Sequence, residues 1–175
     1  MLIRTEQVAV AVGSVRAYPN GFEFTLHGRL REEDEARARG GSDPFDRNPH
    51  GDGKLRAPEQ VLRLGVLYAD GRRTATTARQ DLTDERTGGL MLRQEGGGGT
   101  NRRWDWDFWV HPLPPEGPVV LVASWLEYGV GETMAELDGT AILEASRRSV
   151  ILWPDEPEAD SSTSWRSSNI TSWGG

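Results

Sequence analysis

The sequence contains no cysteine. This excludes disulfide bonds, zinc sites built on thiolates and a cysteine nucleophile. No apolar run approaches the roughly 18 residues that a membrane-spanning helix needs. Residues 1–6 also lack the hydrophobic core that follows the basic start of a signal peptide. We therefore expect a cytoplasmic protein with no membrane partner.

A surplus of basic residues is also missing, because the formal net charge is −7. Domains that bind nucleic acid through its phosphate backbone carry such a surplus, so a nucleic-acid partner is not expected. Among the 20 basic residues, Lys54 is the one lysine. GC-rich codon usage produces this bias without any functional cause.

Glycine and proline are well represented, with 21 and 10 residues among 175, which favours strands and turns over long helices. Apolar side chains alternate with others through residues 7–18 and 22–30, which is typical of half-buried strands. Pro19-Asn20-Gly21 separates these two runs. Asp70-Gly71 separates a second pair, 62–68 and 72–77. Both turns therefore predict antiparallel hairpins.

Further strands are expected at 89–95, 104–110, 119–126 and 129–137, with the four glycines at 96–99 as a flexible connection. The run 119–126 is apolar on both faces, which predicts a strand covered on both sides. Asp138 is placed to cap a helix over 140–153, which Pro154 ends. Together these elements predict a mainly β fold. We expect residues 1–154 to form one antiparallel two-layer β-sandwich of immunoglobulin-like architecture, with a C-terminal helix.

Two segments have compositions that do not suit a packed core. Residues 32–58 are strongly charged, with Phe45 as the single aromatic residue, so we expect a mobile insertion. Residues 155–175 are acidic and then rich in serine and threonine, which predicts a flexible, disordered tail. Isolated tryptophans in a polar tail usually dock on a surface, so Trp165 and Trp173 are candidate binding residues. A frayed tail with incidental tryptophans is the alternative.

The sequence offers no assembled catalytic or metal-binding motif. Its three histidines, at 27, 50 and 111, lack the spacing of metal ligands. The stretch from Asp46 to Asp52 resembles the start of a calcium loop, but Ala57 stands where the bidentate acid belongs. The glycine runs lack the context of phosphate loops, and no Gly-x-Ser-x-Gly elbow occurs. We therefore expect no cofactor, no metal and no enzymatic activity.

Aromatic and acidic residues alternate in the strand 104–109. Trp109, Asp105 and Asp107 share the face opposite Trp104 and Phe108. Aromatic stacking beside carboxylates could bind a sugar, and a pair of acids roughly 7 Å apart lies within the range of inverting glycosidases. Alternatively, the tryptophans at 104 and 106 are core residues and both acids are simply solvated. Under the first interpretation, Trp109, Asp105 and Asp107 are candidate binding residues.

Two stretches, YPNGFEF at 18–24 and FWVHPLPPEGP at 108–118, resemble a group of hypothetical proteins from GC-rich, actinobacterial-type bacteria. The resemblance extends loosely through Trp125 to Leu152-Trp153-Pro154 and covers about two-thirds of the chain, without the insertion and the tail. It implies a shared fold and no particular activity.

The sequence thus predicts a non-catalytic protein-interaction or structural module. A stable β-scaffold with variable loops commonly serves binding, and exposed strand edges pair readily with other chains. We expect a protein partner or self-association. The alternative is a carbohydrate-binding module or glycoside-directed enzyme that uses the strand 104–109.

Overall fold

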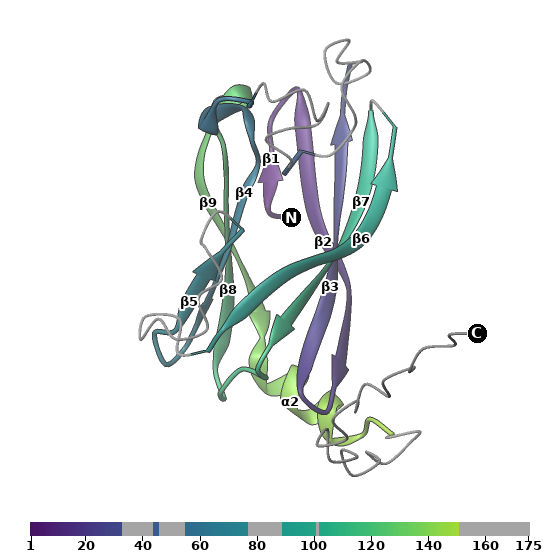
Figure 1. Cartoon of the computed structure of the whole chain (residues 1–175), viewed down its shortest axis with the longest axis vertical. Helices are drawn as coiled ribbons and strands as arrows, with labels where there is room; N and C mark the ends of the chain where they lie inside the picture. The colour runs from purple at the N-terminus through teal and green to yellow at the C-terminus, as the bar shows by residue number, and fades with distance from the viewer. Residues whose placement is uncertain (33–43, 46–54, 77–88, 101, 151–175) are drawn as a thin grey trace, which may run out of the picture.

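The computed structural model describes residues 1–32, 44–45, 55–76, 89–100 and 102–150. Within these ranges the chain forms two antiparallel sheets and one α-helix, with strand orders β1-β2-β3-β7-β6 and β5-β4-β8-β9 (Figure 1). The prediction of a mainly β fold with antiparallel sheets and one helix is confirmed. The elements are β1 (Ile3–Arg4), β2 (Val8–Tyr18), β3 (Gly21–Leu30), η1 (Pro58–Gln60), β4 (Arg63–Tyr68), β5 (Arg73–Ala75), β6 (Met91–Gly99), β7 (Arg103–His111), β8 (Pro118–Trp125), η2 (Leu126–Tyr128), β9 (Val130–Asp138) and α2 (Gly139–Arg147).

Both predicted hairpins are present. Tyr18 pairs with Gly21 across the turn at Pro19-Asn20, which joins β2 to β3. Asp70-Gly71 joins β4 to β5, and the Asp70 carboxylate accepts a hydrogen bond from the backbone N–H of Arg72 (3.1 Å). The turn fixes the register of each hairpin. The hydrophobic alternation of both strands agrees with that register.

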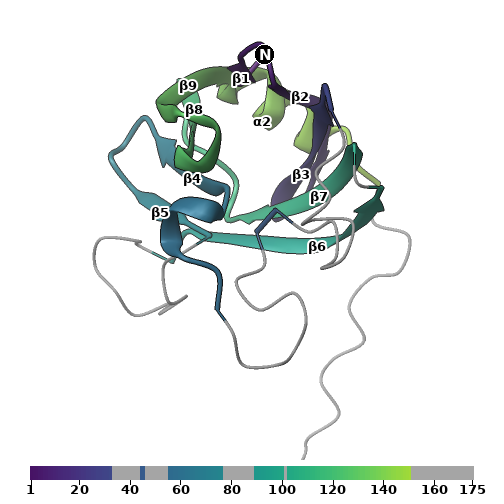
Figure 2. The same ribbon diagram turned by 90° about the horizontal axis from the view of Figure 1, so that it is seen from above.

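One hydrophobic core lies between the inner faces of the two sheets, which Figure 2 shows as opposite walls. Trp104 of β7 and Trp125 of β8 are almost completely buried, and their ring centroids lie 6.1 Å apart across the two sheets. Phe24 and Phe108 stack beside them at 5.5 Å. Tyr68 closes one end of this core by donating a hydrogen bond from its hydroxyl to the carbonyl of Pro112 (2.6 Å).

The expectation of a flexible glycine connection at 96–99 is wrong, because these glycines form the second half of β6. They pair with β7 from Asp107 to Trp104. A Cβ atom at Gly97 or Gly99 would lie 2.3 Å from a backbone oxygen of β7 and 2.6 Å from a tryptophan side chain. Glycine is therefore what allows β6 to lie so close to β7, and Gly97 also has a φ of +137°.

The C-terminal helix starts where predicted and ends earlier. The side chain of Asp138 accepts a hydrogen bond from the backbone N–H of Ala141 (3.1 Å), as an N-cap does. The helix ends at Arg147 rather than at 153. The Ser149 hydroxyl donates to the carbonyl of Ser146, and Val150 beyond it is exposed, so neither helical hydrogen bonding nor packing extends the helix. No helix in the described ranges is long and apolar enough to cross a membrane.

Part of the predicted insertion contributes to the core. Phe45 packs edge-on against Phe108, with ring centroids 5.1 Å apart, and the neighbouring Pro44 carbonyl accepts a hydrogen bond from the N–H of Leu62 (2.9 Å). The remainder of the insertion between 33 and 54, the calcium-like stretch and the tail from 151 onward lie outside the described residues.

Candidate binding surface on the outer face of the first sheet

The outer face of the first sheet carries the polar residues of β3 and β7. Phe22, Phe24 and Leu26 face the core, so Glu23, Thr25 and His27 between them face outward. In the antiparallel register, Glu23 lies opposite Trp109, Thr25 opposite Asp107 and His27 opposite Asp105. The candidate residues Asp105, Asp107 and Trp109 therefore share one outer face, as their alternation predicts, and each has a cross-strand partner on β3.

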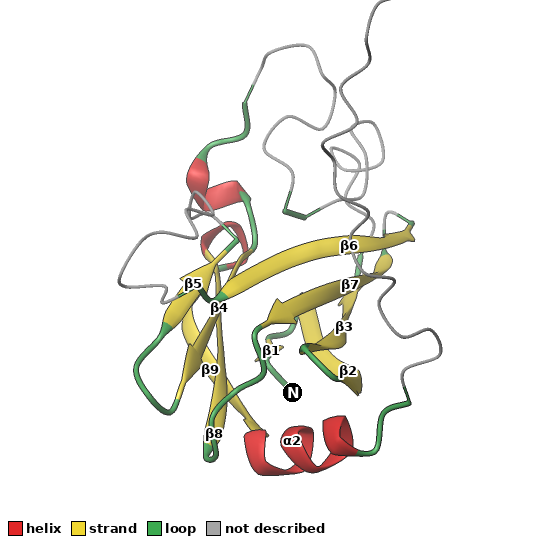
Figure 3. Cartoon of the chain, turned by 60° about the horizontal axis from the view of Figure 1, so that its bottom comes forward, coloured by secondary structure: helices red, strands yellow, loops and turns green. Residues whose placement is uncertain are grey.

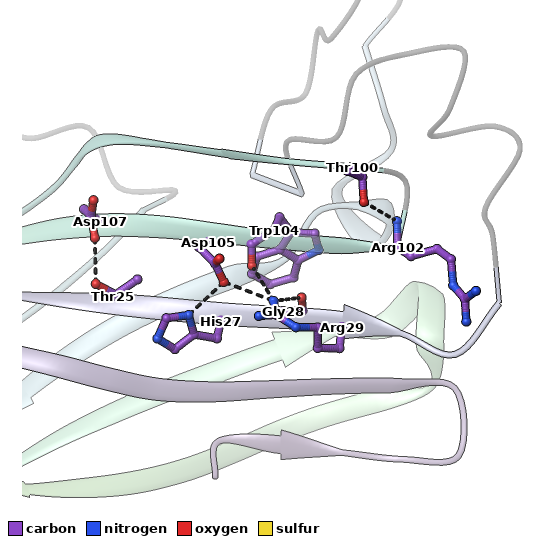
Figure 4. A network of polar contacts seen from close by, with 9 residues as sticks. All are labelled: Thr25, His27, Gly28, Arg29, Thr100, Arg102, Trp104, Asp105 and Asp107. Atoms are coloured by element: carbon purple, nitrogen blue, oxygen red, sulfur yellow. Dashed lines mark hydrogen bonds and ion pairs between the residues drawn. The ribbon is translucent and has the colours of Figure 1, made fainter.

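Asp105 is the centre of a polar network on this face (Figure 4). Its Oδ1 atom accepts hydrogen bonds from His27 Nδ1 (2.7 Å) and from Arg29 Nη1 (3.0 Å). Burial acts to raise the pKa of Asp105, but the hydrogen bonds from His27 and Arg29 and their charge outweigh it and hold the pKa below its ordinary value of 3.8. Asp105 is therefore a stable carboxylate at neutral pH.

Asp107 forms a hydrogen bond outside the Asp105 network. Its Oδ1 atom accepts a hydrogen bond from the hydroxyl of Thr25 (2.6 Å), as Figure 4 also shows. On the other side of β7, Gly96 and Gly98 of β6 pair with Asp107 and Asp105. A Cβ atom at either glycine would have no neighbour within 4 Å, so β6 presents a bare strip of backbone beside the two acids.

Trp109 is half-buried on the same face. Its ring packs against Tyr18 of β2, with centroids 5.4 Å apart and planes tilted by 60°. Gly21 makes room for this ring, since a Cβ atom there would lie 2.6 Å from Trp109 Cζ2.

Two exposed ion pairs flank the aromatic pair. Arg16 Nε lies 2.7 Å from Glu23 Oε1, and Arg93 Nη2 lies 2.6 Å from Glu95 Oε1. The register places Glu23 and Arg93 on either side of Trp109, on β3 and β6. An aromatic centre surrounded by charged groups is the usual composition of a protein-binding hot spot.

No family model, no curated protein and no solved structure matches this chain. Within the described residues, no group of three or more acidic or histidine side chains is placed to hold a metal ion. Trp165 and Trp173, the other two candidate binding residues, lie outside the described residues.

The residues of β2 and β3 that complete this surface could not be predicted from the sequence. Tyr18, His27 and Arg29 lie 91, 78 and 76 positions from the β7 residues that they contact, and alternation alone does not reveal which strands are neighbours. The available signal was the polar face of β3, whose charges complement those of β7.

We predict that Asp105 stabilises the fold in a pH-dependent way. A depressed pKa contributes stability that is complete above the unfolded-state value and is lost as the pH falls through the folded-state value. Asp105→Asn is expected to lower the free energy of unfolding at pH 7 by about 0.2–1 kcal/mol, the usual range for exposed ion pairs. Urea unfolding between pH 7 and 3 should show this difference disappearing below the ordinary pKa of 3.8.

Glu116→Gln is the control for this measurement, because Glu116 is an exposed acid without a side-chain hydrogen bond or ion pair among the described residues. A difference between Asp105→Asn and the wild type that persists unchanged at pH 3 would contradict the assignment.

Proposed function

We propose that this protein is a non-catalytic binding module that recognises a protein partner through the outer face of its first sheet. The observation that carries the proposal is the half-buried Tyr18–Trp109 pair, flanked by the Arg16–Glu23 and Arg93–Glu95 ion pairs. Trp, Tyr and Arg are the residues most enriched in binding hot spots, and a polar rim around them is typical of protein interfaces.

The state of the two acids supports binding over catalysis. A glycosidase needs one carboxylic acid whose pKa is raised so that it can donate a proton. The pKa of Asp105 is lowered instead, and Asp107 already accepts a hydrogen bond from Thr25. Both acids are held by their own sheet, so they suit a fixed recognition surface better than proton transfer.

We also propose that the scaffold is an immunoglobulin-like sandwich, and the strand order supports this. Immunoglobulin domains place strands A, B, E and D in one sheet and C, F and G in the other, with C′ beside C in the variable type. With β2 taken as strand A, chain order gives β2-β3-β7-β6 as A-B-E-D and β5-β4-β8-β9 as C′-C-F-G. In place of the disulfide of antibody domains, Trp104 packs against Trp125 between the sheets.

Trp109→Ala tests the proposed function. The partner is recovered by affinity capture from a lysate of the cells that produce the protein, purified, and titrated against each variant. Loss of a hot-spot tryptophan is expected to weaken binding by about 2 kcal/mol, or about 30-fold. Arg63→Glu is the control, because Arg63 is exposed on β4 of the other sheet, and the affinity of this variant for the partner should change much less.

A partner that binds wild type and Trp109→Ala equally would contradict the proposal. Binding to a glycan array that disappears in Trp109→Ala would instead favour the carbohydrate alternative, because aromatic and acidic groups on one face can also recognise sugar rings. Circular dichroism of each variant establishes that the fold is intact.

A further inference from the structure

The outer face of the second sheet is apolar at its centre. Leu67 of β4 and both Val120 and Val122 of β8 point away from the core and are half-buried, and Met134 of β9 is 61% exposed. The apolar run predicts that the strand 119–126 is covered on both sides. Figure 2 shows no described strand or helix on the outer side of this sheet. An exposed apolar sheet face of this kind marks an interaction site.

Charges of opposite sign lie at the two edges of this face. Arg73 is on the edge strand β5 and Glu136 is on the edge strand β9, and both are exposed. Neither side chain has a hydrogen bond or ion pair within the described part of the chain. The face therefore has a positive edge, an apolar centre and a negative edge.

The register places these residues in two rows across the sheet. One row runs Arg73, Leu67, Val120, Glu136, and the next runs Ala75, Gly65, Val122, Met134. We propose that a second copy of this chain binds here, with a two-fold axis parallel to the strands between β4 and β8. This inference goes beyond the proposed function, because it concerns the opposite sheet.

The rows explain why the occupant is a second copy. Rotation about an axis parallel to the strands brings each residue over the other end of its own row. Arg73 then faces Glu136 of the second copy, and the same contact recurs on the other side of the axis, as an isologous interface requires. An axis perpendicular to the strands would instead place each charge over an apolar residue of the neighbouring row.

Side-chain size also matches within the second row. The same rotation brings Gly65 opposite Val122 and Ala75 opposite Met134 of the second copy, so a small residue faces a large one at each contact. The three atoms nearest to a Cβ atom at Gly65 would be two backbone oxygens and the Cβ atom of Ala75, all in its own sheet, and Gly65 is partly exposed. Interdigitation of small and large residues is how two sheets pack face to face.

The area of this face sets the expected affinity of the dimer. Three strands of at least six residues and the three-residue β5, about 4.8 Å apart, give a footprint of at most about 20 Å by 20 Å per copy. This lies at or below the roughly 800 Å² per partner of a standard specific interface. We therefore expect a reversible dimer that forms between about 1 and 100 μM, as small interfaces do.

Reversing the charges of Arg73 and Glu136 tests the proposed contact between them. Dimerisation of the full chain is measured by sedimentation velocity. Arg73→Glu alone and Glu136→Arg alone each create like-charge contacts on both sides of the axis, and each is expected to raise the dimer dissociation constant at least about 10-fold. The double variant Arg73→Glu/Glu136→Arg should dimerise like the wild type. An equimolar mixture of the two single variants should form a heterodimer, because the introduced charges then face opposite ones.

Arg103→Glu is the control, since it reverses an exposed arginine on the outer face of the other sheet and should leave the dimer unchanged. A wild type that remains monomeric throughout this concentration range overturns the proposal and leaves the face to a different protein. A dimer whose dissociation constant is unchanged in both single variants also overturns it. Recovery in the mixture excludes misfolding as the cause of the losses.

Discussion

Replacing Gly28 with alanine is expected to lower the free energy of unfolding by about 3 kcal/mol, at the upper end of the usual range for overpacking a core. The cause is the position of Trp104. A Cβ atom at Gly28 would lie 1.9 Å from Cζ2 and 2.0 Å from Cε2 of the indole. Trp104 is 1% exposed and has no free direction in which to move, because it packs against Trp125 and Phe45.

Urea denaturation monitored by circular dichroism measures this loss of stability. Gly98→Ala is the matched control. Gly98 also lies in a strand of the first sheet, but a Cβ atom there would meet nothing within 4 Å, so its effect should stay below about 0.5 kcal/mol. In a Trp104→Leu background, Gly28→Ala should cost much less, because the clashing ring atoms are gone. Equal losses in both backgrounds would show that Trp104 is not responsible.

Trp125→Ala is expected to lower the free energy of unfolding by about 4 kcal/mol, as large-to-small changes of buried aromatic residues do. Trp125 is fully buried at the end of β8, in contact with Trp104 of the other sheet and with Tyr128, whose ring lies 4.6 Å away. Its removal leaves a cavity between the two sheets. Since domains of this size have only about 5–15 kcal/mol of stability, the variant should be markedly sensitive to denaturant.

Leu126→Ala provides the neighbouring control, because Leu126 is 55% exposed and its replacement should change stability by less than about 0.5 kcal/mol. A Trp125→Ala variant that unfolds at the wild-type urea concentration would contradict the burial of this residue between the sheets.

The sequence predicted the strands in which apolar and polar side chains alternate. Alternation and the turns at Pro19-Asn20 and Asp70-Gly71 placed the hairpins correctly, because these signals are local. The glycine half of β6 has no side chains to alternate. These glycines form a strand by pairing with residues 104–107 of β7, and the local sequence does not reveal that pairing.

The candidate site was predictable in part for the same reason. The shared face of Asp105, Asp107 and Trp109 follows from period-two geometry within one strand. Their partners Tyr18 and His27 come from distant segments, and nothing local specifies that β3 pairs with β7. The positive and negative edges of the second sheet can be recognised only once the complete strand order is known. Arg73 and Glu136 are separated by two strands and by 63 positions in the sequence.

The glycine half of β6 also determines where this domain opens first. Four consecutive glycines lose more backbone freedom on folding than any other residue type would, and they bury no side chain that would compensate for this loss. β6 is an edge strand, so this segment is held to the sheet by main-chain hydrogen bonds on one side alone. Opening should therefore begin at Gly99 and progress toward Gln94, and amide hydrogen exchange should be fastest along that end of the β6–β7 ladder.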